Sequence, residues 1–126
     1  MRRRWRGLAR RVKALGDPPA DEELHAVRIE AKRVRYAAEA AAPLLGRQAR
    51  VFARAAATLQ GVLGDLNDAV EAERWLRGWA GERRSTPAAF AAGELAGLER
   101  AAAQETRARW RKAWKELSSP RLRSWM

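Results

Sequence analysis

The stretch that decides the fold is LHAVRIEAKRVRY, which runs from Leu24 to Tyr36. An α-helix turns by about 100° per residue, so residues three and four positions apart fall on one side of it. An apolar stripe with this spacing runs through the stretch and just beyond it: Leu24, Val27, Ala31, Val34 and Ala38. The spacing predicts a helix that buries this stripe against its neighbours.

Helix-breaking residues on both sides of this stretch predict four helical segments. A basic leading helix, Trp5 to Leu15, and a linker fill residues 1–20, and the main helices span 21–46, 47–81 and 87–117. The run Gly16-Asp17-Pro18-Pro19 ends the leading helix. The second helix is predicted to start at Asp21 as its N-cap and to stop at Gly46.

The third segment leaves two alternatives open. Gly61 and Gly64 weaken it as a helix, and Asn67-Asp68 can kink it, so the sequence allows either one bent helix or two. A loop is predicted from Gly81 to Pro87, and the last helix should start near Pro87. The tail after Pro120 is short, with Trp125 as a candidate anchor.

Composition supports an all-α fold. Ala, Leu, Arg, Glu and Lys dominate the 126 residues, and these are good helix formers. No stretch alternates apolar with polar residues as a half-buried strand would. Together with the short predicted loops, this indicates one domain over residues 1–126, folded as an antiparallel four-helix bundle.

Charge and residue usage narrow the range of partners. Twenty-six Lys and Arg face fifteen Asp and Glu, for a formal net charge of +11, and such self-repulsion favours an anionic partner. Cysteine is absent and histidine occurs once, so we expect no disulfide, no ordinary metal site and no cofactor. No apolar run approaches the roughly 20 residues of a membrane span, so a cytoplasmic location is expected.

A row of polar side chains borders the apolar stripe of the second helix. Its members are His25, Arg28, Lys32, Arg35, Tyr36 and Glu39. A solvated charged face would lie opposite the stripe, whereas this row abuts it and should be partly desolvated. Internal carboxylates such as Glu39, Asp65 or Asp68 could compensate the cations, and so could a bound polyanion. For the row as a whole we favour ligand binding.

The last helix offers further cations. Arg109 and Lys112 are the candidates to face inward toward the row, because Arg109 shares a face with Leu98, Ala102 and Ala113. Three others are predicted to face solvent: Arg100, Arg107 and Arg111. Trp110 and Trp114, one helical turn apart, are interpreted as packing residues. On the third segment the arginines form what we interpret as a separate surface strip: Arg47, Arg50 and Arg54.

Two motifs together resemble a known family. The run from His25 to Tyr36, followed by LQGVLGDLND from Leu59 to Asp68, is similar to the CHAD domain (conserved histidine α-helical domain). The resemblance extends to the tryptophans of the last helix and to the closing Pro120 and Trp125. It implies a helical bundle with a basic cavity that binds inorganic polyphosphate and is targeted to polyphosphate granules. The implied site residues are His25, Arg28, Lys32, Arg33, Arg35 and Tyr36.

The full domain of that family has two four-helix halves, and this chain resembles only the second. The resemblance therefore implies half of a duplicated helical domain, present either as a natural half-domain or as a fragment. Such a half should form a twofold homodimer that rebuilds the basic cavity. The proposed ligand site joins the row to Arg109 and Lys112. No nucleophile or acid–base pair accompanies His25, so no enzymatic activity is expected. The alternative is a basic helical protein that binds nucleic acid; it is less favoured because no aromatic residues interleave the row.

Overall fold

Five helices make up the part of the chain that the computed structural model describes, residues 1–82 and 86–126. They are α1 (Arg2–Lys13), α2 (Asp21–Leu45), α3 (Arg47–Glu82), α4 (Thr86–Leu117) and the short α5 (Pro120–Arg123). No strand occurs within these two ranges. The predicted all-α class is confirmed.

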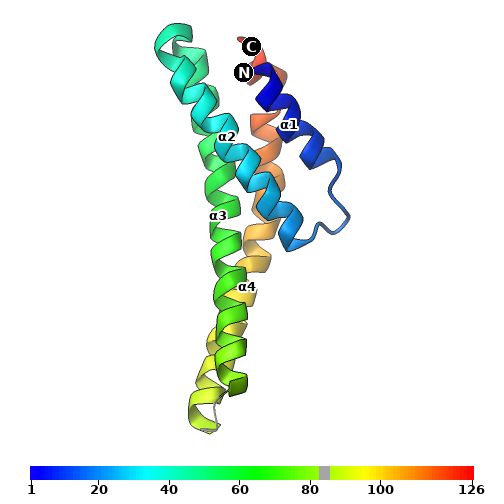
Figure 1. Cartoon of the computed structure of the whole chain (residues 1–126), viewed down its shortest axis with the longest axis vertical. Coiled ribbons are helices and arrows are strands. Elements are labelled where there is room, and N and C mark those ends of the chain that lie inside the picture. Colours follow the sequence, from blue (N-terminus) through cyan, green and yellow to red (C-terminus); the bar gives the residue numbers. More distant parts are fainter. Residues whose placement is uncertain (83–85) are drawn as a thin grey trace.

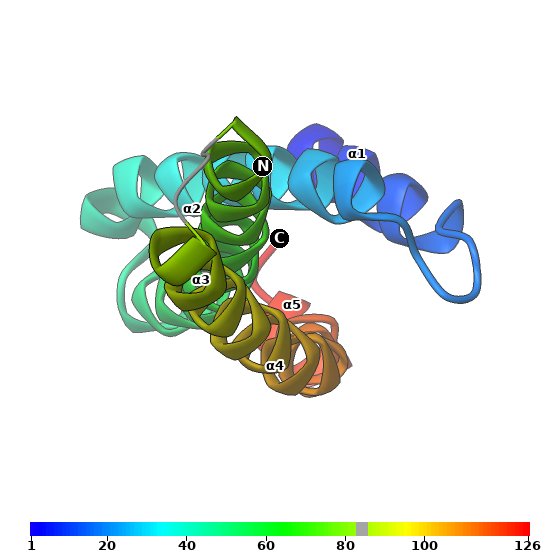
Figure 2. The ribbon, with the colours of Figure 1, turned by 90° about the horizontal axis from the view of Figure 1, so that it is seen from below.

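The long helices α3 and α4 form an antiparallel hairpin, and α1 and α2 flank only one end of it (Figure 1). Seen from below, α2 and α4 lie on different sides of α3 (Figure 2). Four helices therefore surround a common core near the two chain ends, as the bundle prediction requires. Beyond α2 the hairpin continues as a two-helix arm.

The third segment is a single helix of 36 residues, about 54 Å long at 1.5 Å per residue. Gly61 and Gly64 cost roughly 1 kcal/mol each in a helix interior, yet neither breaks it. Burial between the neighbouring helices offsets this cost, since Leu59 and Leu63 of the same stretch are at most 1% exposed. This resolves the alternative that the sequence left open.

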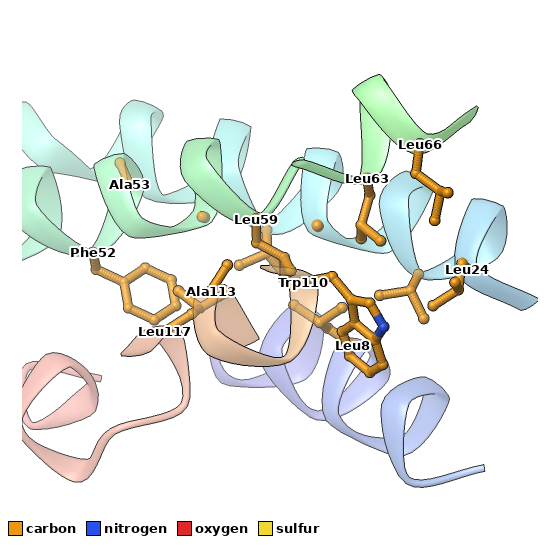
Figure 3. Close-up of a cluster of buried hydrophobic side chains, with 14 of the residues drawn as sticks. Leu8, Leu24, Phe52, Ala53, Leu59, Leu63, Leu66, Trp110, Ala113 and Leu117 are labelled. Atoms are coloured by element: carbon orange, nitrogen blue, oxygen red, sulfur yellow. The ribbon is translucent and has the colours of Figure 1, made fainter. Parts of the chain in front are cut away.

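The core is centred on the stripe of α2 and on aromatic contacts near the chain ends. Figure 3 shows Leu8, Leu24 and Trp110 converging from three helices. Phe52 lies between two tryptophan rings, with centroids 5.9 Å from Trp5 and 5.6 Å from Trp125. These edge-to-face contacts anchor the tail, as predicted.

The two tryptophans of α4 pack, as predicted. Trp110 is 4% exposed, and Trp114 stacks on Trp5 with centroids 5.4 Å apart. Because Trp5 belongs to α1, this stack fixes the leading helix against the last one.

The ends of α2 show one correction and one confirmation. Asp21 is the first helical residue and Ala20 the N-cap, so the predicted cap is wrong. The carboxylate of Asp21 instead pairs with Arg107 of α4. At the start of α2 the carboxylate of Glu23 accepts a hydrogen bond from the backbone N–H of Ala20 at 2.8 Å. At the other end Gly46 has φ +74°, which favours glycine and stops the helix as expected.

The predicted loop over 81–87 is shorter than expected. Its described residues are helical: Gly81, Glu82, Thr86 and Pro87. Its centre, residues 83–85, lies outside the described residues. Pro87 occupies the first turn of α4, where its missing N–H costs nothing.

No helix within the described ranges combines the length and apolar character needed to cross a membrane.

Candidate functional site

The stripe of α2 is buried as predicted, and the polar row lies along its edge. All five stripe residues are at most 2% exposed. Of the row, Arg28 and Arg35 are half-buried, and His25, Lys32 and Tyr36 are exposed. The row therefore borders the core instead of facing away from it, as the sequence indicated, but the predicted partial desolvation holds only for Arg28 and Arg35.

Helix α3 provides the surface against which this row lies. The imidazole Nδ1 of His25 is 2.7 Å from Asn67 Oδ1, and Arg35 Nη1 donates to Gln60 Oε1 at 3.5 Å. Between these two contacts, a Cβ built on Gly64 would meet Arg28 Nε at 3.6 Å, so the guanidinium lies against the helix backbone. The row faces α3 and not α4, and the sequence had missed these three partners.

Charge on the row is only partly compensated. Arg35 Nε donates to Glu39 Oε1 at 2.7 Å, and this hydrogen bond raises the pKa of Arg35, so its guanidinium stays charged. Of the three carboxylates that the sequence offered as partners, only Glu39 pairs with the row; within the described residues Asp65 and Asp68 make no ion pair. Most of the positive charge remains available.

Arg28 holds an unsatisfied donor. Its Nε is buried and has no hydrogen-bond partner within the described residues. A buried donor without a partner lowers the stability of the folded protein by roughly 1–3 kcal/mol. This unfavourable group lies within an ordered row of cations. An anionic oxygen that reached this nitrogen would remove the penalty.

Tyr36 is bracketed by two cations. Its ring centroid lies 5.8 Å from Lys32 Nζ and 5.5 Å from Arg35 Cζ, within the range of cation–π attraction. These contacts hold the two side chains in place near the phenol. Arg33, in contrast, bonds Glu30 at 2.6 Å on the side of α2 turned toward α1, so the structure separates it from the row.

Two arginines of α3 join the row at its other end. Arg50 and Arg54 line one depression of about 420 Å³ together with Arg35 and Glu39 of α2. Their interpretation as a separate surface strip is therefore wrong, because α2 and α3 are antiparallel and bring them beside Arg35. We call the combined surface the basic flank: His25, Arg28, Lys32, Arg35, Tyr36, Arg50 and Arg54.

The opposite end of the basic flank carries mixed charge. A cleft of about 380 Å³ between the start of α2 and the middle of α3 is lined by His25, Asn67 and four charged residues: Asp21, Glu22, Glu71 and Arg74. Asp21 pairs with Arg107, and Glu71 pairs with Arg74 at 2.7 Å. The basic flank is therefore more strongly basic near Arg50 than near His25.

The prediction that Arg109 and Lys112 of α4 face inward toward the row is wrong, and their part in ligand binding stays a prediction. Arg109 and Lys112 are exposed. The buried seam of α4 consists of residues three and four apart: Ala92, Ala96, Ala103, Thr106, Trp110, Ala113 and Leu117. Arg109 and Lys112 each precede a seam residue by one position and so lie about 100° around the helix from it. They take no part in the contacts of the basic flank.

Arg107 also differs from the expectation that it faces solvent. It donates to the carbonyl oxygen of Pro19 at 2.8 Å and pairs with Asp21. This connection ties the linker before α2 to α4 and uses Arg107 in the structure of the bundle.

Comparison with known proteins gives one match. Residues 1–77 match the family model described as the CHAD domain, a span that covers α1, α2 and most of α3, including every residue of the basic flank. Neither a curated protein nor a solved structure matches the chain. The likeness of α4 and the tail to the same family stays a prediction.

Proposed function

The chain belongs to the CHAD domain family, and we propose that its basic flank binds linear inorganic polyphosphate. The observation that supports this most directly is the ordered row of cations on two adjacent helices. Among the residues that the structure describes, Glu39 is its one carboxylate partner, and the buried Arg28 Nε has no hydrogen-bond partner. A flexible chain of phosphates has oxygens at short, regular intervals along its length. It can therefore reach each cation in turn.

The side chains of the basic flank suit different parts of this contact. Arg28, Arg35 and the arginines of α3 can bond phosphate oxygens through two N–H groups at once, while Lys32 acts as a point charge. Hydrogen bonds to Gln60 and Glu39 already fix the direction of Arg35. Binding then orders fewer side chains, which lowers its entropic cost.

We propose binding without turnover. The basic flank offers guanidinium, ammonium, phenol and imidazole groups, and the imidazole is engaged with an amide oxygen and not with a nucleophile. The chain would then hold polyphosphate, with location at polyphosphate granules as the cellular consequence. Sustained release of orthophosphate from polyphosphate by the purified protein would contradict this.

A competition experiment separates polyphosphate from nucleic acid. Labelled long-chain polyphosphate is bound at fixed salt and then displaced by a duplex or a single-stranded oligonucleotide at equal phosphate concentration. We expect neither to displace it efficiently, because α3 packs against the row and the row has a single aromatic member, Tyr36, which cannot stack with successive bases. Tighter binding of either nucleic acid would refute the proposal.

Charge reversal locates the site. Arg28→Glu combined with Lys32→Glu should abolish polyphosphate binding at the basic flank. The matched control is Arg77→Glu combined with Arg100→Glu, which makes the same change of net charge in the two-helix arm and should retain more affinity. Circular dichroism checks folding, and Lys32→Glu alone, at an exposed position, repeats the test if the double variant unfolds. Equal loss in both double variants would show that net charge, not the basic flank, governs binding.

We also propose that two copies pair through the outer face of α4. This face carries a second apolar stripe, spaced by four and three residues: Ala91, Leu95, Leu98 and Ala102. Leu95 is 52% and Leu98 67% exposed. Residues 86–103 hold only two glutamates and one arginine in a chain of net charge +11, so copies can meet here without the repulsion that opposes contact elsewhere.

Light scattering tests the pairing. We expect a dimer at micromolar concentration and a monomer for Leu95→Glu combined with Leu98→Glu. The matched control is Leu44→Glu combined with Leu45→Glu, which also removes exposed leucines but at the turn between α2 and α3. A monomeric unmodified protein would contradict the pairing. The shared basic cavity expected from such a dimer stays a prediction.

A further inference from the structure

Helix α1 is the most densely charged element that the structure describes. Seven of its 12 residues are Arg or Lys and none is acidic. The apolar residues Trp5, Leu8 and Val12 turn inward, and Leu8 is fully buried. The basic residues therefore lie on the outward side of a helix whose orientation is fixed.

These cations have almost no partners. Arg2 donates to the main-chain oxygen of Met126 at 2.7 Å. Among residues 1–82 and 86–126, no ion pair, hydrogen bond or ring contact involves the side chains of the other six: Arg3, Arg4, Arg6, Arg10, Arg11 and Lys13. The contrast with Arg35, which holds Glu39, shows that the surface of α1 is not neutralised from within.

Two depressions with cationic walls lie along this surface. One, of about 560 Å³, is lined by Trp5, Arg6, Arg10 and Lys13. The other lies between Arg6 and Arg123 of α5, where the guanidinium of Arg123 is 5.1 Å from the ring of Trp5. Figure 1 shows the two chain ends side by side, so α5 extends the cationic surface of α1. We call this surface the α1 face.

The α1 face and the basic flank lie on different sides of α2. Gly7 of α1 approaches Glu30, whereas Gly64 of α3 approaches Arg28. Positions 28 and 30 are about 200° apart around a helix. A phosphate chain bound on one surface therefore does not cover the other.

We propose that the α1 face is a second polyphosphate site, so that one protein molecule joins two polyphosphate chains. This rests on the proposed function of the basic flank. The like charges of α1 repel one another in the folded protein, and a polyanion relieves that repulsion. Two sites on different sides of one molecule cross-link long chains, which gives the protein a condensing role beyond simple binding.

Stoichiometry with a short polyphosphate is the decisive measurement. Titration calorimetry at low salt, with a chain too short to reach both surfaces, should give two bound molecules per protein. The combined variant Arg3→Gln, Arg6→Gln, Arg10→Gln and Lys13→Gln should bind one, with affinity for that one changed by less than about threefold. Gln has a helix propensity close to that of Arg and Lys, so α1 should remain folded.

Assembly is the second measurement. Mixed with long-chain polyphosphate, the protein should form large light-scattering particles. The experiment uses the Leu95→Glu, Leu98→Glu background, so that pairing of copies does not itself supply the second site. Either the four α1 substitutions or Arg28→Glu with Lys32→Glu should then abolish the particles.

The outcomes separate the two proposals. If the protein binds no short polyphosphate, both the proposed function and this inference are refuted. One bound molecule, lost on reversal of Arg28 and Lys32, would retain the basic flank and overturn the second site. Two bound molecules that both persist in the α1 variant would also overturn it. Duplex DNA that displaces only the second molecule, at equal phosphate concentration, would assign the α1 face to nucleic acid instead.

Discussion

Replacing Arg50 and Arg54 with Gln tests whether α3 belongs to the polyphosphate site. Both residues are exposed on the first turns of α3 and share a depression with Arg35. Gln keeps the length and helix propensity of the side chain and removes its charge. Neither arginine pairs with a carboxylate in the described residues, so the substitution breaks no structural contact.

The effect can be sized from the cations that the basic flank brings together. Five carry fixed charge: Arg28, Lys32, Arg35, Arg50 and Arg54. For a flexible polyanion each neutralised phosphate contributes about 0.7 to the slope of log affinity against log salt, so the slope should be about −3.5. Without two charges it should be about −2.1. Raising salt fourfold then weakens binding roughly 130-fold in the original protein and roughly 20-fold in the variant.

Affinity at one salt concentration should fall as well. Exposed charge contacts contribute up to about 1 kcal/mol each, so the two substitutions together should cost about 2 kcal/mol. That is roughly 30-fold in the dissociation constant. The loss should shrink as salt rises, because the missing interactions are screened.

Fluorescence anisotropy of end-labelled short polyphosphate, measured between 50 and 200 mM salt, gives both quantities. The control is Arg77→Gln with Arg100→Gln, which removes the same charge from the two-helix arm and should leave the slope near −3.5. The α1 face is neutralised by its four Gln substitutions in every sample, so that only one site is observed. An unchanged slope in the α3 variant would refute the assignment of Arg50 and Arg54, and an equal change in the control would refute the localisation of the site.

Three further predictions concern the framework behind the site. Gly64→Ala should raise stability by about 1 kcal/mol and the melting temperature by about 4 °C, since its Cβ makes only ordinary contact with Arg28 at 3.6 Å. Gly64→Leu should displace that guanidinium and lower polyphosphate affinity; unchanged affinity in the anisotropy assay would contradict the contact. Phe52→Ala, at a fully buried ring, should cost about 4 kcal/mol in urea unfolding, and a loss below about 2 kcal/mol would mean that the tryptophans close the gap. Arg107→Ala should cost about 1 kcal/mol, because the side chains of Arg107 and Asp21 are 31% and 38% exposed and solvent partly screens the pair. No change in the urea midpoint would show that this connection does not stabilise the fold.

The burial of α2 could be read from the sequence because its stripe repeats without interruption over fifteen residues. Each member, from Leu24 to Ala38, is an apolar residue with a charged residue directly before or after it. Because apolar residues recur at helical spacing among charged ones, only one face of α2 is suited to burial. The position of the row beside that face followed from the same geometry.

The face of α4 could not be read in this way. Its sequence holds two apolar stripes, and the larger side chains, Leu95 and Leu98, lie on the outer one. The inner seam uses small residues such as Ala92, Ala96 and Ala103, which let α3 and α4 pack closely. Side-chain size therefore pointed to the wrong face, and Arg109 was placed inward with it. Alanine-rich helices carry too little contrast for periodicity alone to decide.

The residues of α3 that contact the basic row could not be identified from the sequence. Gln60, Gly64 and Asn67 contact Arg35, Arg28 and His25 in antiparallel order. Only the pairing of α2 with α3 shows why these residue types stand three and four positions apart. On α3 alone, a glycine and two amide residues do not indicate a binding site. Their role becomes clear only from the residues of α2 that they contact.

The two sequence motifs are therefore one structural unit. The first supplies the cations, and the second supplies amide oxygens that orient His25 and Arg35 and a glycine that lets Arg28 lie against the backbone. Side chains held in this way lose their conformational freedom on folding and not on binding. A residue at position 64 larger than alanine would remove that preorganisation while leaving every charge in place. For this reason the affinity of Gly64→Leu distinguishes an ordered site from a merely basic surface.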